Sequence, residues 1–296
     1  MNLFIYLFIM ESSEYKKSAN EDQKCSLSRR YDGVSCSTIK ELQDMANAWN
    51  IYIKKHKINK EPIEVQGTTK RSLVESLLGR LKNVCSDQLC MVGQDFIEYT
   101  QDKHNIKKKT YLPAAPKGQF EWLSTSHINE YIDQLQDVFV NYKFLGAVPI
   151  DFDEINIGIR NLNFDKLFKS GKTQIGIIFN TDTSKGRGQH WISLFADLNN
   201  KKIYFFDSTG NAPPKEVKAF MDRIANWIMT HYKIDKKKID IRWSKMEHQK
   251  KNSECGMYCI HWQTAMLQGR SFDDYNKKRI TDDEVNRFRK KYFTLR

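Results

Sequence analysis

Three side chains occupy positions where a fold presents groups for chemistry: His190, Asp207 and Cys255. His190 follows a polar loop and precedes an apolar run, and Asp207 directly follows a second apolar run. A histidine oriented by a carboxylate can act as a general base and acid, and a cysteine beside it can act as the nucleophile. These residue types therefore indicate covalent catalysis by a thiol.

The two apolar runs predict a β-hairpin that brings His190 and Asp207 together. Residues 191–197 and 202–206 have the composition of buried strands, and two asparagines at 199–200 favour a tight turn between them. If the hairpin closes at that turn, the sequence positions of two residues that face each other add up to about 398. His190 then lies beside Asp207 at the open end, where an imidazole–carboxylate hydrogen bond can form.

Cys255 precedes Gly256 at the predicted start of an apolar helix over 255–267. Free backbone N–H groups and the helix dipole favour a thiolate at such a position, and the glycine lets a substrate carbonyl approach the backbone. Gln249, six residues earlier, can donate its side-chain amide to an oxyanion. Cys259, one turn into the helix, is expected to pack as a small apolar side chain.

A metal site built from His248, Cys255, Cys259 and His261 is the alternative for this region. His248 is predicted to lie in a loop, and His261 is rotated about 160° from Cys259 on the helix, so the four side chains would not converge. We therefore expect no metal and no cofactor.

The six cysteines are too few for a small disulfide scaffold in a chain of 296 residues. Cys85 and Cys90 have no second ligand pair at the spacing of a zinc site. We therefore expect reduced thiols and a cytosolic protein.

Composition indicates a folded chain of roughly two domains. Hydrophobic residues make up 40% and aromatic residues 12%, which excludes wholesale disorder. The net charge of +12 favours loose attraction to polyanions, but no segment has the dense basic block of a dedicated nucleic-acid binder.

The chain divides into three predicted parts: a flexible leader over residues 1–37, a helical arm over 38–115 and a catalytic core over 116–296. Residues 1–10 are almost all apolar but are about half as long as a membrane-spanning helix. Two interpretations stay open: translation starts at Met10, or residues 1–9 form a short anchor, and otherwise no membrane association is expected.

The arm shows helical periodicity over 38–53 and again from Gly67, with a basic connector between. This arrangement faintly resembles a SAP-type DNA-binding module with an overlong connector. The alternative, which we favour, is a helical arm that packs on itself.

The core mixes strands and helices without regular alternation, which predicts an α+β fold. Strands are expected at 173–179 and 239–243 besides the hairpin, and helices at 120–142 with Ser124 as cap, from 213 to 231, and from a capping box at Thr281.

Taken together, the motifs resemble the SUMO/adenovirus-type cysteine protease superfamily. They comprise His190-Trp191, Asp207-Ser208, the run from Gln249 to Tyr258, and Trp122-Leu123 with Ile128 and Tyr131. The stretch FFDSTGNAPP at 205–214 and RITDDEVNRFR near the end resemble the polyprotein-processing proteases of the African swine fever virus type. That type has asparagine at the position of Asp207. The likeness covers about residues 118–296.

The resemblance implies a central mixed sheet flanked by helices, with Cys255 as nucleophile, His190 as base and acid, and Asp207 as orienting carboxylate. Gln249 and the backbone N–H of Cys255 would form the oxyanion hole. Trp122 and Trp191 would clamp a thin Gly-Gly tail over the nucleophile.

The implied activity is cleavage of a viral polyprotein at Gly-Gly-X sites during virion maturation, in the viral factory of the host cytoplasm and in the virion. One alternative is a deSUMOylase or deubiquitinase that acts on host conjugates. The other is a nucleic-acid-binding protein that uses the arm and the basic surface.

Overall fold

The computed structural model describes residues 25–118 and 120–294. They divide into two compact units. The arm unit runs up to Ala114 and includes the chain's end from Phe293, and the sheet unit is Ala115–Tyr292. Thr294 joins the arm unit because its backbone N–H donates to the carbonyl of Pro113 over 2.8 Å. The end of the chain therefore belongs to the arm unit, although the sequence prediction placed it in the core.

Two helices organise the arm unit, and each begins at a threonine cap. Thr38 and Glu41 form a capping box at the start of α2 (Ile39–Lys55), and the Thr69 side chain accepts from the backbone of α3 (Lys70–Leu81). Three short elements complete the unit: α4 (Gln88–Met91), the 3-10 helix η3 (Asp95–Tyr99) and α5 (Ile106–Thr110).

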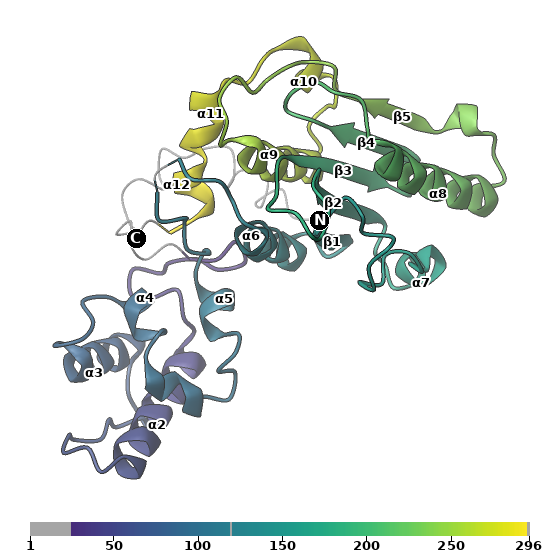
Figure 1. Ribbon diagram of the computed structural model, residues 1–296. Helices are drawn as coiled ribbons and strands as arrows, with labels where there is room; N and C mark the ends of the chain where they lie inside the picture. The colour runs from purple at the N-terminus through teal and green to yellow at the C-terminus, as the bar shows by residue number, and fades with distance from the viewer. Residues whose placement is uncertain (1–24, 119, 295–296) are drawn as a thin grey trace. The chain divides into compact units, whose positions relative to one another are not determined.

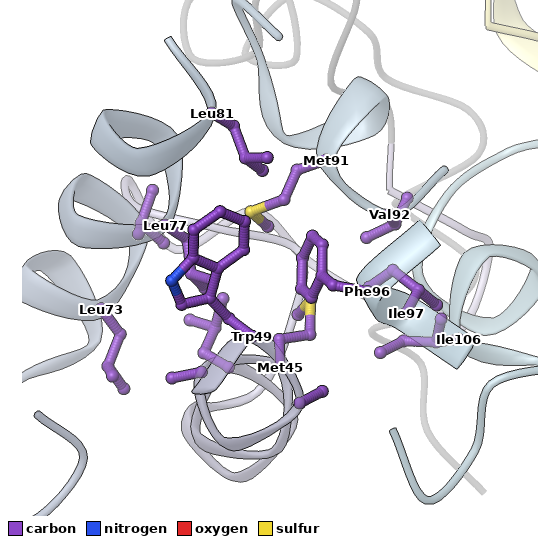
Figure 2. Close-up of a cluster of buried hydrophobic side chains, with 14 of the residues drawn as sticks. Met45, Trp49, Leu73, Leu77, Leu81, Met91, Val92, Phe96, Ile97 and Ile106 are labelled. Atoms are coloured by element: carbon purple, nitrogen blue, oxygen red, sulfur yellow. The ribbon is translucent and has the colours of Figure 1, made fainter. Parts of the chain in front are cut away.

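The arm unit has its own hydrophobic core (Figure 2). Trp49 of α2 lies at its centre, edge-on to Phe96 with 5.8 Å between ring centroids. Aliphatic side chains from α3, α4 and the segments beyond close around this pair: Leu73, Leu77, Leu81, Met91, Val92, Ile97 and Ile106. The arm is therefore a folded unit whose helices pack on each other.

Four cysteines of the arm unit are paired as disulfides, Cys25 with Cys36 and Cys85 with Cys90. The expectation of reduced thiols was wrong for these four residues, because the local fold brings their Cα atoms to 5.3 and 5.5 Å. Of the described cysteines, only Cys255 and Cys259 are free. The cysteines therefore give no argument for a reducing compartment.

Residues 25–37, predicted as part of a flexible leader, pack on the arm unit instead. The backbone N–H of Ser26 donates to the carbonyl of Thr110 over 2.9 Å, and the Gln88 side chain donates to the carbonyl of Val34 over 2.8 Å. Cys25 and Cys36 are buried. The rest of the predicted leader, residues 1–24, lies outside the described residues.

A five-stranded mixed sheet forms the centre of the sheet unit (Figure 1). The strands lie side by side in chain order: β1 (Tyr142–Pro149), β2 (Gln174–Asn180), β3 (Trp191–Asp197), β4 (Lys202–Phe206) and β5 (Asp240–Trp243). The two outer pairs are parallel, and the inner pairs β2–β3 and β3–β4 are antiparallel. The predicted α+β fold with a central mixed sheet is confirmed.

Helices cover the two faces of the sheet. Because side chains alternate along a strand, Ile192, Leu194 and Ala196 of β3 share a face, and they are buried with the apolar stripe of α8 (Lys215–Tyr232). On the opposite face, Trp262 of α9 (Cys255–Leu267) stacks on Phe206, with ring centroids 5.4 Å apart. The fully buried α9 thus lies directly against the central strands.

The sequence analysis did not predict β1, and the helix that it predicted at 120–142 extends too far at both ends. Ser124 caps α6 (Thr125–Val138) as expected, but the chain then turns into β1 at Tyr142. Gly146, at φ 114°, lies at a register irregularity that breaks the alternation by which a strand is recognised. The remaining helices are α7 (Phe164–Lys169), α10 (Asp274–Lys277), α11 (Asp282–Arg287) and α12 (Arg289–Tyr292), with the 3-10 helix η4 (Lys236–Lys238).

Within the described part of the chain, no helix is both long and apolar enough to cross a membrane. The apolar residues 1–9 lie outside that part.

Candidate active site

The hairpin of β3 and β4 brings His190 and Asp207 into contact. The strands pair so that Ser193 faces Phe206 and Leu194 faces Phe205, within one residue of the predicted register. The His190 Nε2 atom lies 2.7 Å from Oδ1 of Asp207. The expected imidazole–carboxylate hydrogen bond is therefore present at the open end of the hairpin.

Asp207 is buried, and its carboxylate is held by more than the histidine. The backbone N–H and the hydroxyl of Thr209 donate to the same Oδ1 atom, over 2.9 and 2.8 Å. Burial raises the pKa of Asp207, but the bonds from His190 and Thr209 outweigh it and hold the pKa below its ordinary value. Asp207 is thus a fixed anion that orients the imidazole.

Asp207 contacts Nε2 of His190, and Cys255 interacts with the same imidazole. Burial alone would lower the pKa of His190. The hydrogen bond to Asp207 and the interaction with Cys255 reverse this effect and raise the pKa to about 9. Near neutral pH the histidine is therefore protonated, which suits a thiolate–imidazolium pair.

Cys255 is the first residue of α9, as predicted, and the sheet fixes that helix. Gln263, two turns on, donates its amide to the hydroxyl of Ser193 and the carbonyl of Leu194, over 2.8 and 2.7 Å. Its Oε1 atom accepts from the Tyr142 hydroxyl over 3.1 Å. These bonds hold α9 against β3, the strand that His190 precedes.

Gln249 is buried and fixed from both ends of its amide. Its Oε1 atom accepts from the Ser208 hydroxyl, and its Nε2 atom donates to the carbonyl of Lys251, each over 2.7 Å. The amide nitrogen has two hydrogens, so one remains for a substrate oxygen. Ser208, the neighbour of Asp207, is thus a residue that sequence reasoning did not assign and that fixes Gln249.

The two candidate tryptophans differ in exposure. Trp122 is 44% exposed, whereas Trp191 is 5% exposed and donates its indole N–H to the carbonyl of Leu123 over 2.9 Å. Leu123 also touches α9, because a Cβ atom added at Gly256 would lie 2.9 Å from the Cβ atom of Leu123. Leu123, which the sequence analysis gave no role at the site, therefore holds Trp122 next to the start of α9.

The residues of the alternative metal site have other partners. The Nδ1 atom of His248 accepts from the backbone of Ile280, and its Nε2 atom donates to the carbonyl of Tyr275. His261 pairs with the Tyr292 hydroxyl over 3.0 Å. The described residues contain no group of three or more His, Cys, Asp or Glu side chains arranged to hold a metal ion.

Comparison with known proteins settles the family. Residues 159–295 match the C-terminal catalytic domain of the Ulp1 protease family, and this range contains His190, Asp207 and Cys255. A thiol protease of Acanthamoeba polyphaga mimivirus is 32% identical over 280 residues, which cover 90% of this chain and 91% of that protein. The chain is a cysteine protease of the Ulp1 family.

Two further matches agree with this family and with the fold. The SUMO-1 cysteine protease of African swine fever virus is 24% identical over 231 residues, which cover 71% of this chain and 84% of that protein. The crystal structure of the African swine fever virus protease matches with a TM-score of 0.63 and 19% identity, over 95% of this chain and 99% of that one. The predicted membership of the superfamily is thus confirmed.

Proposed function

We propose that this protease is an endopeptidase that cleaves after Gly-Gly in viral structural polyproteins through a Cys255–His190–Asp207 triad. The 2.7 Å bond between His190 and Asp207, at a site shared with Cys255, is the observation that carries the triad. It orients an imidazole that can protonate the leaving amine.

The reaction has two steps. The Cys255 thiolate attacks the scissile carbonyl carbon, and the oxyanion takes hydrogen bonds from Gln249 and the backbone N–H of Cys255. The imidazolium of His190 gives its proton to the leaving amine as the C–N bond breaks, which leaves a thioester. Neutral His190 then takes a proton from water, whose oxygen attacks the thioester and releases Cys255.

The preference for Gly-Gly rests on the family resemblance and on the residues around the nucleophile. Leu123 lies against Gly256, which places the exposed Trp122 beside the start of α9. A peptide that passes under an indole there must be thin, and glycine adds no side chain that would collide with the ring. Trp191 contributes by fixing Leu123 rather than by an exposed ring face.

Peptide and conjugate substrates test this proposal. The protease should cut a peptide with an internal Gly-Gly-Ala site after the second glycine. Turnover of a SUMO or ubiquitin C-terminal reporter without cleavage of the peptide would favour a deconjugase instead. Because the matched relatives are viral proteins, we also propose that the protease acts in the host cytoplasm and in the virion during maturation.

Association with nucleic acid remains a second, accessory proposal for the arm unit. Lysines 54 and 55 end α2, and Lys107, Lys108 and Lys109 lie on α5; all five are exposed. Such cations would release counterions from a phosphate backbone, so the affinity for DNA should fall steeply with salt. A flat salt dependence would contradict this proposal.

A further inference from the structure

Glu254, the residue directly before the nucleophile, is a buried carboxylate. It is 1% exposed and occupies the position that precedes the first turn of α9. Its two oxygens accept three hydrogen bonds, from the backbone N–H and the hydroxyl of Ser253 over 2.9 and 3.0 Å and from the Asn286 amide over 2.9 Å. A carboxylate this well held fixes the backbone that leads into Cys255.

Asn286 links Glu254 to the end of the chain. It lies on α11, and its Nδ2 atom donates to Glu254 while its Oδ1 atom accepts from Nε of Arg289 over 2.8 Å. If the Asn286 amide were flipped, its NH2 group would face the donor Arg289 and its oxygen would face the acceptor Glu254. The orientation of the amide is therefore defined. Asn286 therefore bridges a buried anion and a buried cation.

Arg289 is a buried cation near the nucleophile. It lies on α12, is 6% exposed, and its Nη2 atom donates to the carbonyl of Ser253 over 3.3 Å. Its Nη1 atom is buried and has no hydrogen-bond partner among the described residues. Burial lowers the pKa of Arg289, while Glu254 and Cys255 favour its charged form. The guanidinium and the catalytic thiol thus interact electrostatically.

We propose that Glu254, Asn286 and Arg289 are positioning residues that hold the start of α9 and balance the charge next to Cys255. This inference rests on the proposed role of Cys255 as the nucleophile. The carboxylate anchors the segment that leads into the helix but repels a thiolate, and the guanidinium offsets that repulsion. The C-terminal helices α11 and α12 thereby control the reactivity of a residue more than 30 positions earlier in the chain.

Two other titratable groups, His190 and Cys259, interact with Cys255, and Asp207 interacts with both of these. His190 comes from the start of β3 and Asp207 from the end of β4, and Cys259 lies one turn further along α9. Glu121, before α6, interacts with Arg289. All these groups remain in the variants described next, so a change in the pH dependence of Cys255 reports on the altered residue alone.

The rate of alkylation by iodoacetamide as a function of pH tests the charge balance. Loss of the anion in Glu254→Gln should move the midpoint of the rate profile to lower pH, and loss of the cation in Arg289→Met should move it to higher pH. Each shift should reach about half a pH unit or more, and the double variant should return towards the wild type. The Cys255→Ser protein supplies the background rate.

Two further variants separate charge from packing. Arg289→Lys loses the planar guanidinium but keeps the positive charge. Because the charge is kept, the midpoint of the alkylation profile should stay at the wild-type value. Arg287→Met, which removes an exposed arginine on α11, is the matched control and should leave the profile unchanged. Glu254→Gln is nearly isosteric and keeps the test available if Arg289→Met fails to fold.

Shifts of the same sign in Glu254→Gln and Arg289→Met, or none in folded proteins, would overturn the inference. A failure of the proposed function looks different. In that case Cys255 of the wild type would be alkylated with the expected profile, but no Gly-Gly peptide would be cut.

Discussion

The indole N–H of Trp191 donates to the carbonyl oxygen of Leu123, 68 residues earlier in the chain, over 2.9 Å. This bond joins the start of β3 to the segment before α6. Because the side chain of Leu123 lies against Gly256, the same residue also contacts α9. Leu123 therefore contacts the residue after His190 and the residue after Cys255, and it directly follows the exposed Trp122.

Gly256→Ala should disturb this support. The added Cβ atom would lie 2.9 Å from the Cβ atom of Leu123, which is closer than such atoms approach. We expect a loss of about 1–3 kcal/mol in the free energy of unfolding and a lower kcat/KM. Urea denaturation and peptide cleavage measure the two effects. Leu123→Gly removes that Cβ atom, so Leu123→Gly combined with Gly256→Ala should cost less stability than the sum of the two single variants. A double variant whose loss equals that sum would contradict the contact.

Asp207→Asn should keep the geometry of the imidazole but remove the charge that stabilises the imidazolium. We expect kcat to fall at least about tenfold, and further in Asp207→Ala, where the hydrogen bond is lost as well. Steady-state cleavage of a Gly-Gly peptide gives both values. If both variants kept the activity of the wild type, the assignment of Asp207 to the triad would be wrong.

The raised pKa of His190 predicts the alkaline limit of activity. The folded protein protonates His190 with a pKa of about 9, compared with an ordinary value of 6.5. The stabilisation from this protonation is therefore complete below about 6.5 and is lost as the pH rises through about 9.

The thiolate–imidazolium pair loses its proton over the same range, so kcat/KM should decline with a midpoint near 9. Asp207→Asn should lower that midpoint, because a neutral amide supports the imidazolium less. A midpoint that stays in place in the Asp207→Asn variant would show that another group sets the limit.

The hairpin and the start of α9 could be predicted from the sequence because local patterns determine them. The run at 191–197 and the turn at 199–200 fix a register, and the register places His190 beside Asp207. The supports of the site are instead long-range. Leu123 and Arg289 lie within motifs that the resemblance named, but no local pattern gives either residue a role at the site. Each acts on residues that only the folded chain brings near.

The arm shows the same division between local and long-range information. Helical periodicity and the threonine cap indicated α2, but spacing alone did not reveal that Cys25 meets Cys36. That pairing depends on how residues 25–37 pack against the core of the arm unit.

Removing the Cys25–Cys36 disulfide should destabilise the arm unit. The bond closes a loop of 11 residues, so Cys25→Ser with Cys36→Ser should lose about 2–4 kcal/mol of unfolding free energy. Thermal unfolding followed by circular dichroism, with and without reductant, measures the loss. Reductant should lower the Tm of the wild type and have a smaller effect on the double variant. An identical response in both proteins would contradict the prediction.

Cleavage of a peptide with an internal Gly-Gly-Ala site, by the wild type and by Cys255→Ser, tests the central claim most directly. We expect the wild type to cut after the second glycine, with mass spectrometry identifying both products. Neither the Cys255→Ser protein nor alkylated wild type should cut, whereas Cys259→Ser should remain active. Cleavage by Cys255→Ser at the wild-type rate would contradict the assignment of the nucleophile.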